Sequence, residues 1–514
     1  MVSTVARQLL KEKLNKGLTV MLKKLSCFVV TAFMLGACGG GSDSPTNNTG
    51  GGSGGGGNAT TYQLSLTSVG VNQCNEESPL TTSRVVIHNA DFTERTVLNP
   101  NSNGQFSYST SDSHVSFSLV SYREIEPGIF QTNIQTTISA PTTDLGVFYT
   151  NHEVDVDCGC YDDLVTVVVP DLVGEIEETT VYLGGSQTVS DVSQRTTDGV
   201  QVPLEICRNN GESIITGNVS IVPQMLSRGI MPQQFVSGMT VEASLDTTAI
   251  SVNSQSANSI YKYTYSYIDG IARYSSTDST YDDDYLYLVN EPTIDAHEIN
   301  VTTSDTFYHP EFDFGFYIIA RTDMHNDIAS QYEMPLADVN VEKIVDVVLA
   351  EDSQYDVSGE MPSADLFRVS TALQTETMQE SLVWGISMPV VGEFPNIDNW
   401  DPLEYLDTSS ALLGEPDSLN LDVILVGYEN AQTYDDFLIN QRDFESGIFD
   451  VRFNQYELAV IVLETGDTSQ FEAPLVSQRV TNLVRHNPNR KSADELASSN
   501  KAKAKLKQQL KSRY

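Results

Sequence analysis

Residues 105–121 read QFSYSTSDSHVSFSLVS, and this segment gives the clearest indication of the fold class. Apolar and aromatic residues alternate with serine and threonine on both sides of a short polar interruption that contains Asp112. A period of two is typical of a half-buried β-strand, and a brief polar interruption is typical of a turn. We therefore predict two strands, Gln105–Thr110 and Val115–Ser121.

Similar short runs between Asn-, Gly- and Asp-rich turns continue along the chain in both directions. We predict further strands at Ser83–His88, Leu164–Val169, Thr179–Leu183, Tyr261–Ile268, Tyr285–Val289, Phe312–Arg321, Ser418–Tyr428 and Tyr456–Leu463. Parallel sheets would need helices of roughly 10–15 residues between strands, and few such patterns occur. The sequence predicts a mainly β protein made of tandem antiparallel β-sandwich modules of immunoglobulin-like type.

Three segments have helical patterns. Val341–Leu349 spaces its apolar residues as a helix does, although its β-branched residues also suit a strand. Thr433–Phe444 begins with a Thr-x-x-Asp capping pattern and stops near Gly447. Ser492–Arg513 opens with a capping box and continues in good helix formers, so we predict a short basic C-terminal helix.

The predicted organisation follows composition and pattern. We divide the chain into a signal peptide (1–37), a Gly/Ser-rich tether (38–59), a first β-sandwich module (60–160), a second, shorter β module (161–212), two larger β-rich units (213–345 and 346–484) and a basic tail (485–514).

Charge is distributed unevenly over the 514 residues, whose formal net charge is −40. Residues 38–484 contain 66 acidic and 14 basic residues, whereas the last thirty residues contain nine bases and two acids. Such an acidic body excludes nucleic acid as its default partner. A solvated surface kept soluble by charge is the simplest interpretation, and adaptation to salt and binding of divalent cations are two others.

The N-terminal region contains a second informative stretch. Met21-Leu22-Lys23-Lys24 precedes a thirteen-residue apolar run, Leu25–Ala37, which is too short to span a bilayer. The run ends in Leu35-Gly36-Ala37-Cys38, which resembles the lipobox of bacterial lipoprotein signal peptides. The resemblance covers residues 21–38 only, and no family is recognised for the remainder.

This resemblance implies cleavage before Cys38, a diacylglycerol on its thiol and a fatty acyl chain such as palmitate on its new amino group. Several acyl chains give stable anchoring, where one would be marginal. Gly39 rather than Asp follows the cysteine, which implies transport to the outer membrane. Because residues 1–20 would make an unusually long leader, we expect translation to start at Met21. The tether, with ten glycines in residues 39–58, would hold the body roughly 25 Å from the membrane.

Export would place the remaining cysteines, Cys74, Cys158, Cys160 and Cys207, in an oxidising space, and two disulfides are the default there. A Cys158–Cys160 bridge would be strained, so we favour Cys74–Cys158 with Cys160–Cys207. A redox-active pair or a thiolate metal site is the alternative, but acidic neighbours raise a thiol pKa and disfavour both.

Two constellations could bind a ligand. Tyr261, Tyr263, Tyr265 and Tyr267 alternate without a break, so on a strand they share one face, where they could stack sugar rings or pack against another sheet. Asp282, Asp283 and Asp284 could supply oxygens to Ca²⁺, although they do not match an EF-hand loop. No cofactor is otherwise predicted.

The sequence contains no Walker loop, no dinucleotide-binding fingerprint and no His-Glu-x-x-His zinc motif. We therefore assign no catalytic residue, and we leave open whether the protein is an enzyme. We expect a non-enzymatic, lipid-anchored outer-membrane protein that binds a glycan, a surface polymer or another envelope protein. The basic tail would contact anionic lipid or cell-wall polymer. The two alternatives are a secreted-type hydrolase that depends on carboxylates or a metal, and a structural accessory of envelope assembly. Sequence does not fix which side of the outer membrane the body faces.

Overall fold

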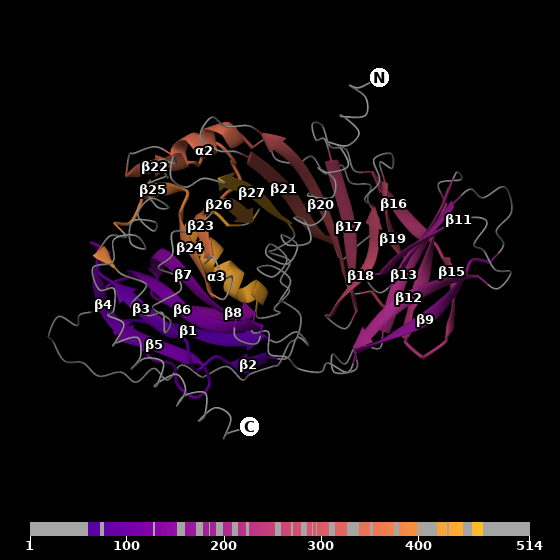
Figure 1. Ribbon diagram of the computed structural model, residues 1–514, viewed down its shortest axis with the longest axis horizontal. Helices are drawn as coiled ribbons and strands as arrows, with labels where there is room; N and C mark the ends of the chain where they lie inside the picture. The colour runs from indigo at the N-terminus through magenta and orange to yellow at the C-terminus, as the bar shows by residue number, and fades with distance from the viewer. Residues whose placement is uncertain are drawn as a thin grey trace, which may run out of the picture.

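The computed structural model describes residues 60–465, apart from 72–76, 127–128, 152–159, 171–177, 184–185, 192–198, 208–213, 223–225, 252–258, 269–270, 279–284, 290, 295, 308–313, 326–338, 350–352, 375–379, 397–398, 401–418, 429–430 and 446–454. Within these ranges the protein is mainly β, with two helices, α2 (Val341–Leu349) and α3 (Tyr434–Glu445) (Figure 1). Neither helix is long and apolar enough to cross a bilayer.

The largest sheet has 12 strands and joins early and late segments of the chain. Neighbouring strands are antiparallel except β7 and β24, which pair in parallel from Phe130 and Glu380 to Thr137 and Ser387. This pair is the junction between the early and the late strands. The strands lie in the order β18 (Ile271–Asp278), β17 (Ser259–Ile268), β20 (Ala296–Phe307), β21 (Phe314–His325), β27 (Gln455–Thr465), β26 (Leu419–Tyr428), β23 (Leu366–Gln374), β24 (Glu380–Pro389), β7 (Ile129–Pro141), β6 (His114–Glu126), β3 (Arg84–His88) and β4 (Glu94–Leu98).

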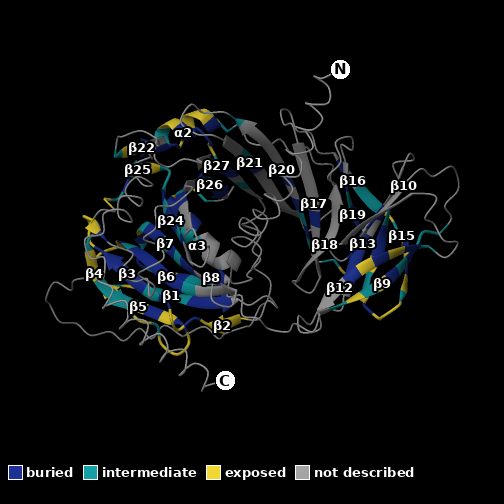
Figure 2. Ribbon diagram, in the orientation of Figure 1, coloured by how far each residue is buried: buried dark blue, intermediate teal, exposed yellow. Residues whose placement is uncertain are grey.

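A four-stranded sheet packs face to face on the early end of the largest sheet. It consists of β2 (Glu77–Pro79), β1 (Tyr62–Val71), β5 (Gln105–Thr110) and β8 (Asp144–Asn151), with β8 parallel to β1. Alternate residues of the two sheets meet in one core, formed by Leu64, Leu66, Phe106, Val85, Ile87, Phe117 and Leu119 among others. The alternation in residues 105–121 therefore reflects burial between two sheets (Figure 2).

The opposite face of the largest sheet is covered near its centre by α2 and by the strand pair β22 (Gln354–Asp356) and β25 (Val391–Glu393). Asn340 caps α2, because its side-chain oxygen accepts a hydrogen bond from the Lys343 amide at 3.3 Å. The helix buries apolar residues at positions 341, 344, 345 and 348, the spacing of one helical face. They pack in one core with Phe367, Trp384 and Trp400.

A seven-stranded sheet with its own core forms the other end of the molecule (Figure 1). Between the two large sheets lies the pair β16 (Thr247–Ser251) and β19 (Tyr285–Val289), since β19 contacts both β14 and β17. The seven strands lie in the order β11 (Ser186–Asp191), β10 (Glu178–Leu183), β13 (Ile214–Val222), β14 (Leu226–Gln234), β15 (Thr240–Leu245), β9 (Cys160–Val168) and β12 (Val200–Cys207).

The largest sheet curves around α3 (Figure 1). Thr433 caps this helix, since its hydroxyl accepts a hydrogen bond from the Asp436 amide at 3.1 Å. The Tyr434 hydroxyl donates to the Ser387 carbonyl of β24 at 3.2 Å, and Leu438 packs against the core between the two packed sheets. The helix is therefore fixed to both the early and the late part of the chain.

The mainly β prediction is confirmed, and so are the two internal helices, with ends within a residue or two of the expected ones. Most strand pairs are antiparallel, as expected, but three described pairs are parallel: β1–β8, β9–β15 and β7–β24. The predicted C-terminal helix, the signal peptide and the tether lie outside the described residues. The boundaries of the predicted units stay predictions.

Candidate functional site

The predicted tyrosine row lies on β17, one strand in from the edge of the largest sheet. The strand is hydrogen-bonded on both sides, to β18 and to β20. Thr264 and Ser266, which alternate with the tyrosines, are fully buried, and the Ser266 hydroxyl lies 3.2 Å from Nδ1 of buried His297. Strand alternation therefore assigns the tyrosine positions to the other face of the sheet. The tyrosine side chains themselves lie outside the described part.

The strand register identifies the positions that share this face. Tyr263 lies opposite Asn300 of β20 and Thr277 of β18, and Tyr265 lies opposite Glu298 and Tyr274. We call these positions, together with the rest of the tyrosine row, the tyrosine face. It combines aromatic rings with an amide, a carboxylate and a hydroxyl, which can both stack on a ligand and exchange hydrogen bonds with it.

Of the other predicted site residues, the described part of the structure brings together one pair, Cys160 and Cys207. Cys38, Cys74, Cys158, Asp282, Asp283 and Asp284 lie outside the described residues, so the lipid and Ca²⁺ predictions rest on sequence. Among the residues that are described, no three His, Cys, Asp or Glu side chains gather in a way that could hold a metal ion. Cys160 and Cys207 are described as strand residues, and they lie directly opposite each other in the β9–β12 ladder.

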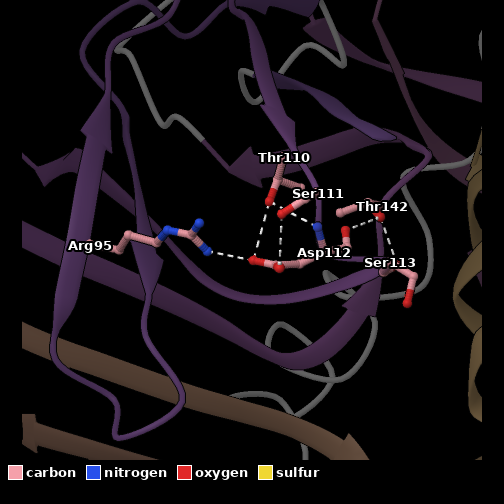
Figure 3. Close-up of polar contacts among 6 residues, drawn as sticks. All are labelled: Arg95, Thr110, Ser111, Asp112, Ser113 and Thr142. Atoms are coloured by element: carbon pink, nitrogen blue, oxygen red, sulfur yellow. Dashed lines mark hydrogen bonds and ion pairs between the residues drawn. The ribbon is translucent and has the colours of Figure 1, made fainter. Parts of the chain in front are cut away.

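A surface cluster that sequence reasoning missed surrounds Asp112, in the turn between β5 and β6 (Figure 3). Arg95 of β4 donates to its carboxylate at 2.6 Å, and the Thr110 hydroxyl donates at 3.2 Å. These hydrogen bonds, the Arg95 bond foremost, lower the pKa of Asp112. The Thr142 hydroxyl donates to the carbonyls of Asp112 and Ser113, so the turn is fixed from three elements.

The cluster continues to α3 through Ser113 and His114. Nδ1 of His114 lies 3.1 Å from the Ser113 hydroxyl, and Nε2 lies 2.8 Å from the Asp435 carboxylate. These are the residue types of a hydrolase triad, but the His114 and Asp435 side chains are about 40% exposed, and the serine is the immediate chain neighbour of the histidine. The contacts instead attach the first turn of α3 to the start of β6.

A buried polar chain crosses the junction between the early and the late strands. Nε2 of His88 lies 2.8 Å from the Ser118 hydroxyl, and that hydroxyl lies 2.7 Å from the Thr136 hydroxyl. The indole of Trp384 on β24 donates to Thr136 at 2.9 Å. His88 also stacks on Phe92, with ring centroids 4.1 Å apart. Burial lowers the pKa of His88 to about 4, so the ring is neutral at pH 7.

A guanidinium also lies against the sheet. Arg368 of β23 extends over Gly385 of β24, where a Cβ atom would come within 2.3 Å of the guanidinium. Its Nε is shielded from solvent and has no hydrogen-bond partner. Burial lowers the pKa of Arg368, and the charge of Asp422 acts in the opposite direction. Only glycine at position 385 leaves room for this side chain in its present place.

Comparison with known proteins adds little. No family model and no curated protein matches the chain. A solved structure that is similar to it in part is a crystal structure of a tetra-tandem repeat in the extending region of a large adhesion protein. That match has 7% sequence identity and a TM-score of 0.10, and covers 71% of this chain and 96% of that one. At this score the likeness supports no argument about fold or function.

Proposed function

We propose that this protein is a lipid-anchored, non-enzymatic protein of the outer membrane that binds a glycan through the tyrosine face. The main support is the place of the tyrosine row on β17, between two hydrogen-bonded neighbours. Pairing on both sides fixes the backbone that bears the tyrosines, which lowers the conformational entropy that ligand binding would cost.

The composition of the tyrosine face favours a sugar over an apolar ligand. Ring faces stack on the C–H surface of a pyranose, and the strand register puts two hydrogen-bonding residue types, Asn300 and Glu298, opposite Tyr263 and Tyr265. The acidic body opposes binding of polyanions, so a neutral or weakly charged glycan is the expected class.

Anchoring is proposed from the lipobox, with Cys38 as the acylated residue and the basic tail as a second contact with anionic envelope polymers. The first module is proposed to be a β-sandwich of immunoglobulin-like type. Its support is the packing of the four-stranded sheet on β3 and β6.

The tyrosine face is tested by replacing Tyr263 and Tyr265 together with alanine. We expect capture of the protein on immobilised neutral polysaccharides to fall at least tenfold, because two of the aromatic rings proposed to stack on the sugar are removed. Thr264 and Ser266 on the buried face of β17 are unchanged. Capture is measured on a polysaccharide panel, with circular dichroism to verify folding.

The matched control replaces the same two residues with phenylalanine, which keeps the rings and removes only the hydroxyls. We expect this variant to retain most of the binding. Equal capture by the alanine variant and the unmodified protein would contradict the proposal.

A further inference from the structure

We propose that Cys160 and Cys207 form a disulfide across the β9–β12 ladder. The argument starts from the register, in which eight successive pairs run from Val200 opposite Val167 to Cys207 opposite Cys160. Facing residues of an antiparallel pair have Cα atoms about 4.5 or 5.5 Å apart, and both values fall within the range that a disulfide requires.

Both cysteines belong to the same face of this ladder. Val165, Val167, Val202 and Leu204 are buried, whereas Leu164 is 48% exposed and Asp162, Gln201 and Pro203 are exposed as well. By strand alternation, positions 160 and 207 fall on the exposed side. A bond there links the strands without taking space in the core.

The place of the pair in the sheet gives the bond a physical role. β12 is the edge strand, and β9 pairs with β15 only at Thr166, Val167 and Val168. Towards Cys160 the described ladder is therefore two strands wide, and two-stranded ribbons are marginally stable in water. Two pairs along the ladder from the cysteines, Asp162 lies opposite Glu205, and like charges at facing positions destabilise a strand pair further.

Asp162 and Glu205 also favour a disulfide that is slow to exchange over a reactive one. Nearby negative charge raises a thiol pKa, and a thiol of high pKa is a slow leaving group in exchange. We therefore infer a structural disulfide rather than a catalytic one. Its formation removes two protons and two electrons from the two thiols, and a disulfide-bearing oxidant of the cell envelope accepts them by exchange, so formation in the cell rests on the proposed export.

Pairing Cys160 with Cys207 also selects one of the three pairings that four cysteines allow. It leaves Cys74 and Cys158 as the two remaining thiols, which can pair only with each other. Since Cys158 and Cys160 are separated by one residue, the two bonds would be neighbours along the chain.

The test uses the full chain with Cys27, Cys38, Cys74 and Cys158 replaced by serine, so that Cys160 and Cys207 are its two cysteines, incubated with oxidised glutathione. We expect free thiols at 160 and 207 to fall to none, the protein to stay monomeric on a non-reducing gel, and the urea midpoint to drop when the bond is reduced. Mass spectrometry of a non-reduced digest should show the two cysteine peptides joined.

The matched control has Cys160 and Cys207 replaced by serine. Three results in the first variant would overturn the pairing: Cys160 and Cys207 stay free thiols after oxidation, the protein forms disulfide-linked dimers, or the two thiols are protected only when Zn²⁺ is added. If the purified protein closes the bond with glutathione but cells contain it reduced, the pairing stands and the proposed export fails.

Discussion

His88 occupies a position where adding a proton is costly. Its side chain is 3% exposed, and burial lowers its pKa from 6.5 to about 4. The unfolded chain therefore takes up this proton more readily than the folded one. As pH falls from 6.5 towards 4, this histidine alone should reduce the free energy of unfolding by up to about 3 kcal/mol, a loss that is absent above pH 6.5.

We predict that His88→Gln, which cannot titrate, weakens the fall in stability between pH 7 and pH 4.5. The measurement is the urea midpoint of both proteins at both pH values, because acidic residues shared by the two cancel in the difference. The unmodified protein, measured at the same two pH values, is the reference. If His88→Gln loses as much stability between pH 7 and pH 4.5 as the unmodified protein, protonation of His88 does not cause the loss.

The buried polar chain also shows why sequence reasoning misses some residues. His88, Ser118 and Thr136 come from three strands, and each polar residue viewed alone suggests a turn or an exposed strand position. Their burial follows from packing on both faces of β3, β6 and β7, which local alternation does not reveal. Sequence reasoning also missed the positions of Asn300 and Glu298. They lie opposite the tyrosine row because of the β17–β20 register, which no local sequence pattern reveals.

At the scale of elements, a loop rests on the end of β26. The Asp365 amide donates to the Val426 carbonyl at 2.9 Å, and the Ser363 hydroxyl donates to the Glu457 carboxylate of β27. A Cβ atom at Gly427 would lie 1.5 Å from the backbone oxygen of Ser363. This contact is with backbone, so no side-chain movement can relieve it.

We predict that Gly427→Ala separates this loop from the strand and costs about 1–3 kcal/mol of stability. Urea denaturation measures the loss. Gly359→Ala is the control, because a Cβ there meets nothing within 4 Å, and it should change stability by less than about 0.5 kcal/mol. Equal losses of stability in Gly427→Ala and Gly359→Ala would show that the contact of Gly427 with the Ser363 backbone is not what makes the first substitution costly.

The bounds of strands and helices were easier to predict from the sequence than the pairing of the strands. The run Gln105–Thr110 and the helix Val341–Leu349 have the expected bounds, because alternation and helical spacing are local properties of the chain. The pairing of β7 with β24 depends on contacts between residues about 250 positions apart, and no local pattern specifies it.

At the scale of the whole molecule, the proposed anchoring depends on one residue. We predict that Cys38→Ser moves the protein from the membrane pellet to the soluble fraction, because this substitution removes the thiol that is proposed to accept the lipid. Fractionation with an antibody against the body measures this, and Cys74→Ser, which leaves the lipobox intact, is the control. Retention of Cys38→Ser in the pellet would contradict lipid anchoring through this cysteine.

The parallel junction of β7 with β24 also sets the order in which the protein can fold. The early strands can pair with one another soon after they are made, but β7 has an open edge until a segment about 250 residues later arrives. Closing so long a loop is slow, and an open edge invites pairing with other chains in the meantime. A chain that crosses a membrane N-terminus first would expose this edge throughout its passage, so a periplasmic chaperone that shields strand edges should raise its yield.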